Sequence, residues 1–145
     1  MLVLEVYISW VCIMRSHGNY DCEIEDKTLC IKLYGATNVQ LLDEVLNHVK
    51  TQVVQSDLTE FAVMVDLSEW DLSEFGSETA FEKYRPWFIE HGQRFEAIIV
   101  GGSMVKKMET LKYFLGFDSK LSIKYFASNG DARKWLEEHN MLFKK

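Results

Sequence analysis

Paired cysteines are missing from this sequence. Its three cysteines, Cys12, Cys22 and Cys30, are odd in number and have no C-x-x-C spacing. A disulfide framework needs cysteines in pairs, and structural zinc sites usually present two of them close together. The sequence therefore argues against a disulfide-stapled domain and a structural zinc site, and it favours a reducing compartment such as the cytoplasm.

Catalytic and metal-binding histidine patterns are absent as well. The four histidines, His17, His48, His91 and His139, are dispersed, without an H-E-x-x-H motif or an evident nucleophile–base pair. Metal-assisted hydrolysis and acyl transfer both need such groups in a fixed arrangement. We therefore expect no catalytic residue, no metal and no cofactor, and we interpret the chain as non-enzymatic.

Basic side chains are in the minority. Lys and Arg number 16 against 22 Asp and Glu, which gives a formal net charge of −6. An acidic chain is repelled by phosphate backbones and by strongly anionic bilayers. We therefore expect no nucleic-acid partner.

Linker segments are also absent. Pro86 is the single proline, and no Pro-, Gly- or Ser-rich stretch divides the 145 residues. With 48% apolar residues, a chain of this length can bury one sizeable core. We expect one domain over residues 14–145.

Long apolar runs are missing except near the start of the sequence. Residues 1–14 are apolar at twelve of fourteen positions, with Glu5 and Ser9 between them. This run is too short to span a bilayer and lacks the basic segment and cleavage site of a signal peptide. Two interpretations of residues 1–13 stay open: an extra strand or helix packed on the domain, or sequence upstream of a true start at Met14.

Alternating apolar and polar residues over 20–34 predict a β-hairpin. With Asp26 and Lys27 as a two-residue loop, each apolar residue of the first strand faces an apolar residue of the second. The expected pairs are Ile24 with Leu29, Cys22 with Ile31, and Tyr20 with Leu33. Cys22 and Cys30 then point to opposite faces, so we expect free thiols.

Helical and strand patterns alternate along the rest of the chain. Apolar residues at helical spacing predict a helix from Asn38 to about Gln55, with Leu42, Val45, Leu46, Val49 and Val53 buried. A buried strand follows at 61–65, because apolar residues fill both of its faces. Further elements are expected as a strand at 96–102, a helix from Ser103 to Leu115, a strand at 121–126, and a final helix after Asn129 that buries Ala132, Trp135 and Leu136. This order predicts an α/β fold: a small mixed sheet with an antiparallel N-terminal hairpin, largely parallel remaining strands, and about four to five helices.

Aromatic residues are concentrated after the central strand. Six of nineteen consecutive residues are aromatic: Trp70, Phe75, Phe81, Tyr84, Trp87 and Phe88. We expect Pro86 to divide the helix that begins near Ser77 into two short pieces, the second ending at Gly92. Phe81, Tyr84 and Phe88 share one helix face, whereas Trp87 lies off that stripe.

Two interpretations of these aromatic residues are open. In the first, all of them belong to the core. In the second, they form a mobile flap over an apolar pocket that admits a lipophilic small molecule or rests on a membrane surface. The six residues are therefore the candidate ligand-binding residues.

Two polar segments are weaker candidates for binding. Asp66, Glu69, Asp71 and Glu74 follow the central strand, where α/β folds bind ligands, but a solvated loop explains them equally simply. Residues 101–103, Gly-Gly-Ser, could hold an anion at a helix start, or form only a tight turn with a cap.

Four segments together resemble a known family. They are the hairpin ending at Gly35, the strand end Val65-Asp66-Leu67, the strand Ala97-Ile-Ile-Val-Gly101, and the closing Tyr125-Phe126 with Asp131-Ala-Arg-Lys-Trp-Leu136. The pattern is similar to the STAS family, and in particular to its SpoIIAA-like bacterial branch, which is often grouped with CRAL-TRIO-like lipid-binding domains. The resemblance covers residues 18–142.

The resemblance implies several functional features. It implies a cytoplasmic binding or regulatory domain, peripheral to the membrane where it takes a lipid, with a protein partner or a homodimer as the alternative. The antagonist branch of the family has a phosphorylated serine at the start of the helix after the central strand, and Ser77 is the residue at that position. The Asp-Ser-Ser-Gly context of that branch is replaced here by Ser73-Glu-Phe-Gly-Ser77-Glu, and we therefore interpret Ser77 as a helix cap rather than as a phosphorylation site.

Overall fold

The computed structural model describes residues 19–36, 39–71, 77–101 and 120–144. In these ranges the chain forms one five-stranded sheet whose strands lie side by side in chain order. The strands are β1 (Asn19–Glu25), β2 (Thr28–Ala36), β3 (Phe61–Asp71), β4 (Gln93–Ile99) and β5 (Ser122–Phe126). The helices are α2 (Val39–Gln55), α3 (Ser77–Glu90) and α5 (Asn129–Glu138).

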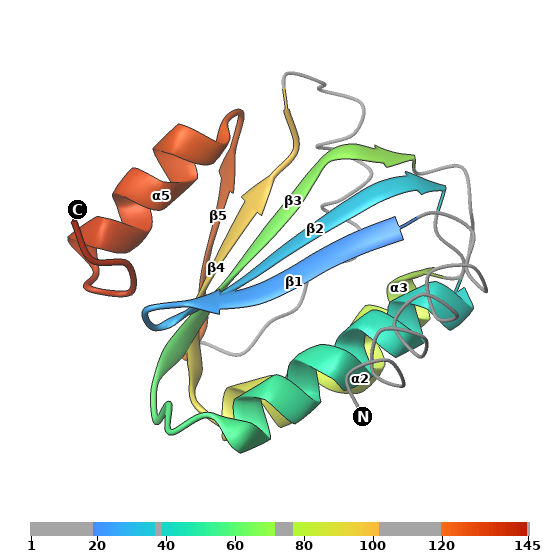
Figure 1. Ribbon diagram of the computed structural model, residues 1–145, viewed down its shortest axis with the longest axis horizontal. Coiled ribbons are helices and arrows are strands. Elements are labelled where there is room, and N and C mark those ends of the chain that lie inside the picture. The colour runs from blue at the N-terminus through green and yellow to red at the C-terminus, as the bar shows by residue number, and fades with distance from the viewer. Residues whose placement is uncertain (1–18, 37–38, 72–76, 102–119, 145) are drawn as a thin grey trace, which may run out of the picture.

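The arrangement confirms the predicted α/β class. β1 pairs with β2 antiparallel, and all other neighbouring strands are parallel. α2 and α3 lie together on one face of the sheet, and α5 covers the other (Figure 1). The described ranges hold three helices, fewer than the four to five expected. The helix predicted from Ser103 lies outside the described residues, as do residues 1–18.

The hairpin has the register predicted from its alternating pattern. Ile24 faces Leu29, Cys22 faces Ile31 and Tyr20 faces Leu33. Hydrogen bonds to the segment after α5 hold the turn in place. The Lys27 N–H and the Thr28 hydroxyl both donate to the Met141 carbonyl, at 3.1 and 2.8 Å. The Asp26 carboxylate accepts from the Phe143 N–H at 2.9 Å. These bonds stabilise a turn in which Asp26 takes the left-handed φ of 55°.

The core has two parts, one on each face of the sheet. The part under α2 and α3 contains Phe61, Val63 and Val65 of β3. It also contains the predicted apolar stripe of α2, which is buried at all five positions: Leu42, Val45, Leu46, Val49 and Val53. The part under α5 contains the intervening Ala62 and Met64. This confirms that residues 61–65 form a strand buried on both faces.

β3 is longer than predicted. The sequence indicated a sharp exit and a loop after Val65, but the strand continues to Asp71. After an irregularity between Lys32 and Tyr34, β2 continues to pair with it, with Gly35 opposite Trp70. Leu67 and Trp70 are 0% and 2% exposed, so their burial extends the strand. The predicted loop over 66–71 is therefore wrong, and β4 likewise begins earlier than expected, at Gln93.

α3 is continuous, which corrects the predicted break at Pro86. The helix runs from Ser77 to Glu90 with Pro86 inside it. Pro86 is exposed, whereas Arg85 before it and Phe88 after it are buried. Because proline has no N–H, the helix lacks one backbone hydrogen bond at Pro86. The packing of the buried residues on both sides of the proline compensates for this loss. The predicted end of the helix near Gly92 is confirmed.

Gly92 is a position where only glycine fits. Its φ is +113°, and a Cβ there would lie 2.0 Å from the Thr59 carbonyl oxygen. We expect Gly92→Ala to lower the free energy of unfolding by about 3 kcal/mol or more. The strain of a positive φ at alanine and the clash of the new Cβ both contribute to this cost. Thermal melts should show a midpoint lower by roughly 10 °C.

The matched control is Gly130→Ala in α5. A Cβ at Gly130 meets nothing within 4 Å. Because alanine is the better helix former, this change should be neutral or stabilising by up to about 1 kcal/mol. Equal destabilisation by both variants would contradict the assignment of a special role to Gly92.

Candidate functional site

The predicted aromatic residues converge on the face of the sheet covered by α2 and α3. Trp70 of β3 is 2% exposed, and Tyr84 and Phe88 of α3 are 7% and 6% exposed. Trp87 is half-buried and packs against the same core. The side chains of Phe75 and Phe81 lie outside the described residues. The structure therefore brings four of the six candidates together, three of them in the core.

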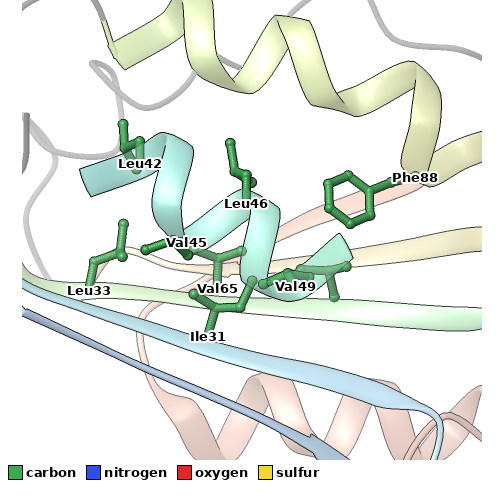
Figure 2. Close-up of a pocket in the computed structure, with 9 residues that line it drawn as sticks. Ile31, Leu33, Leu42, Val45, Leu46, Val49, Val65 and Phe88 are labelled. Carbon is green, nitrogen blue, oxygen red and sulfur yellow. The ribbon is translucent and has the colours of Figure 1, made fainter. Parts of the chain in front are cut away.

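An apolar cavity of about 40 Å³ lies between α2, α3 and the sheet. Figure 2 shows Leu42, Val45, Leu46 and Val49 along α2, with Phe88 approaching from α3. The described residues that line the cavity are all apolar: Ile31, Leu33, Leu42, Val45, Leu46, Val49, Val63, Val65 and Phe88. A void with this lining stays dry and suits an apolar guest.

Trp87 lies where α2 and α3 meet. Its ring stacks on His91 with a centroid distance of 3.7 Å and an angle of 18°. The Lys50 ammonium of α2 lies 5.0 Å from the centre of the same ring, within the range of a cation–π contact. Trp87 of α3 therefore contacts α2 through Lys50.

A buried ion pair lies beneath α3. Arg85 of α3 and Glu96 of β4 are 9% and 5% exposed, and Arg85 Nη1 lies 3.2 Å from both Glu96 carboxylate oxygens. Gln93 Nε2 also donates to Glu96 Oε1, at 3.1 Å. Burial and the charge of Glu96 raise the pKa of the nearby Tyr125 hydroxyl to about 12, so this group stays protonated at neutral pH.

This buried network adjoins the apolar cavity. Glu96 is the direct cross-strand partner of Val63, and Val63 lines the cavity. Opposite partners in neighbouring strands project from the same face of the sheet, so their side chains are neighbours. Sequence reasoning did not find the network, although a glutamate at the start of an otherwise apolar strand pattern was the available signal.

The other face of the sheet has a polar groove of about 190 Å³ between β1–β3 and the start of α5. Two of the carboxylates that line it accept hydrogen bonds: Asp21 from the Tyr34 hydroxyl and Asp66 from the Ser68 hydroxyl, each at 2.6 Å. Lys32, which also lines the groove, lies 2.6 Å from the Glu69 carboxylate. Arg133 pairs with Glu25 at the other end of the groove. Of the predicted acidic segment after the central strand, Asp66 and Glu69 are therefore paired strand residues. The side chain of Asp71 and the whole of Glu74 lie outside the described residues.

The two described thiols are free and lie on opposite faces of the sheet, as predicted. Cys22 donates to Gln52 Oε1 at 2.9 Å. Burial raises the pKa of Cys22 to about 12 and that of Cys30 to about 11, with smaller contributions from neighbouring negative charges. A protonated thiol is a poor nucleophile, so neither is suited to covalent catalysis at neutral pH.

Among the described residues, no three His, Cys, Asp or Glu side chains are grouped closely enough to hold a metal ion. None of the described helices combines the length and the apolar character that a membrane crossing requires.

These pKa values predict slow alkylation of Cys22 and Cys30. At pH 8, a thiol with a pKa of about 11 is ionised in roughly one molecule in a thousand, against about one in four for an unperturbed thiol. Iodoacetamide should therefore modify both at least about 100-fold more slowly in the folded protein than in urea, with rates rising as pH approaches 11. Peptide-resolved mass spectrometry measures this, and equal folded and unfolded rates would contradict it.

No protein-family model and no curated protein matches the chain. Solved structures, in contrast, do match the chain. An uncharacterized DUF3478-family protein with a SpoIIAA-like fold, from Shewanella loihica PV-4, matches with a TM-score of 0.61 and 15% identity, over 82% of this chain and 94% of that one.

Two structures of SpoIIAA match as well. The anti-sigma factor antagonist SpoIIAA in its unphosphorylated form has a TM-score of 0.53 and 12% identity, over 81% of this chain and 97% of that one. The Bacillus cell fate determinant SpoIIAA in its phosphorylated form has a TM-score of 0.53 and 13% identity, over 81% and 98%. The strand order, the antiparallel hairpin and these matches together show that the chain has the SpoIIAA-like fold, in agreement with the resemblance to STAS domains.

Proposed function

We propose that this chain is a non-enzymatic binding domain that takes a small apolar molecule between α2, α3 and the sheet. The observation that supports this function is the cavity beneath α3, which is lined by apolar side chains in the described part of the chain. Small-molecule sites are generally apolar concavities with a few polar groups at one side, and the Arg85–Glu96 pair adjoins this one.

The ligand must widen the cavity in order to enter. A volume of about 40 Å³ is well below the roughly 150 Å³ of a dry cavity that accepts benzene. α3 is the element suited to move, because Pro86 removes one of its helical hydrogen bonds. α2, in contrast, is held by its full apolar stripe.

The candidate aromatic residues take different parts in this proposal. Phe88 forms the cavity wall, Tyr84 and Trp70 belong to the surrounding core, and Trp87 closes the edge between the two helices. Phe75 and Phe81 stay candidates from the sequence. A cytoplasmic domain of this kind, peripheral to a membrane, would obtain its apolar ligand from the bilayer.

Filling the cavity should block binding. Val45 lines the cavity and is 2% exposed, so Val45→Leu places an extra methylene where the ligand would lie. Because a core overfilled in this way costs about 1–3 kcal/mol, we expect the affinity for the neutral fluorescent probe N-phenyl-1-naphthylamine to fall about tenfold or more. Fluorescence titration measures the affinity.

Val54→Leu is the matched control, because Val54 lies on the same helix and is 66% exposed. It should leave probe binding unchanged. Failure of the wild-type protein to bind the probe, or equal binding by the Val45→Leu variant, would remove the support for an apolar ligand.

A protein partner is the second candidate function. One of the similar structures is an anti-sigma factor antagonist, and SpoIIAA has been solved with and without phosphorylation. α3 of this chain begins at Ser77, and the backbone N–H groups of a helix N-terminus can receive a phosphate.

Because the flanking motif of the antagonist branch is absent, we expect Ser77→Ala to cost only a capping contribution of about 1 kcal/mol in a denaturation experiment. Recovery of a phosphorylated Ser77 peptide from native cells, with loss of a defined partner in Ser77→Asp, would favour this second function.

A further inference from the structure

The Arg85–Glu96 pair is an unusual neighbour for an apolar cavity. Both residues are at least nine-tenths buried, and both carboxylate oxygens of Glu96 lie 3.2 Å from one guanidinium nitrogen. Removing two charges from water is expensive, and a buried ion pair is often no more stabilising than apolar residues of similar size. Stability alone therefore does not account for charged residues at this place in the core.

Neither residue of the pair lines the cavity, but each is next to a residue that does. On the sheet, Glu96 is opposite Val63, which lines the cavity. On α3, Arg85 precedes by three residues Phe88, which forms the cavity wall. Residues three apart are neighbours on a helix surface. A molecule that widens the cavity under α3 toward this side would therefore meet the ion pair at one end, and its remaining described contacts would be the apolar residues of the lining.

The charge of the pair restricts the ligand's polar end. Arg85 and Glu96 together are neutral, and they present a donor beside an acceptor. An uncharged hydroxyl or amide can accept from the guanidinium and donate to the carboxylate. A carboxylate or ammonium group would leave one uncompensated charge in the buried site, which costs far more.

We propose that the ligand is an amphiphile with an uncharged hydrogen-bonding head, such as an alcohol or a primary amide, that sits against Arg85 and Glu96 with its apolar tail in the cavity. This rests on the proposed apolar-ligand function and specifies its chemistry. The Gln93 side chain, which donates to Glu96 Oε1, helps to hold the polar end of the site in place.

Three probes that differ only in the head group test the proposal. 1-Decanol, decanoate and decylamine are used to displace bound N-phenyl-1-naphthylamine at pH 7.5, where the last two are charged. For the wild-type protein we expect decanol to compete about tenfold or more better than either charged probe. Equal competition by all three, or better competition by decanoate, would overturn the proposal.

Charge variants give a readout that a purely structural role would not change. Glu96→Gln leaves the site with a net positive charge, so the preference should shift from decanol to decanoate by about tenfold or more. Glu90→Gln, an equal change on the exposed surface of α3, is the control and should keep the wild-type order. An unchanged order in Glu96→Gln would contradict the proposal.

A double variant covers the case in which a single change unfolds the protein. Replacing both charges by apolar residues, Arg85→Met with Glu96→Leu, should preserve the fold and lose the preference for decanol over decane. A retained preference would show that the head group binds elsewhere. If the naphthylamine probe binds but none of the amphiphiles displaces it, the head-group inference alone fails; if the probe itself does not bind, the proposed function fails.

Discussion

The burial of β3 on both faces is the constraint on which the rest of the packing depends. Its residues alternate in direction: Phe61, Val63 and Val65 face the helix pair, and Ala62 and Met64 face α5. Small residues allow a close approach on the α5 side, where Ala62, Ala97 and Ala132 are completely buried. On the other side two helices share one surface, and their side chains leave a void between them.

Elements whose apolar residues recur at a regular spacing within one segment were predictable from the sequence. The hairpin register follows from alternation over fifteen residues, and the buried face of α2 follows from helical spacing, because each pattern is read within one segment. The extension of β3 was not predictable in this way. It depends on the burial of Trp70 against distant residues and on continued pairing with β2 beyond an irregularity. The continuity of α3 through Pro86 likewise depends on tertiary packing that overrides a local rule.

The candidate site was only partly visible in the sequence. Of the six aromatic candidates, Phe88 lines the cavity, and Trp70 and Tyr84 belong to the core around it. The cavity is the space that side chains from four elements leave between them. Its presence depends on how these elements pack together, so no local sequence pattern predicts it. The ion pair was hidden for a different reason: Arg85 and Glu96 lie on elements whose relative placement only the fold provides.

The bonds between the hairpin turn and the last residues of the described chain have a consequence for the order of folding. Thr28 and Met141 are 113 positions apart, and Asp26 and Phe143 are 117 apart. Contacts this distant in sequence carry a high loop-closure cost and form only when the intervening chain is already compact. During synthesis on the ribosome, the hairpin turn is made 113 residues before Met141, so the bonds that hold the turn can form only after this length of chain has followed it. A supersecondary unit whose strands are neighbours in the sequence thus has to wait for a distant segment before it is complete.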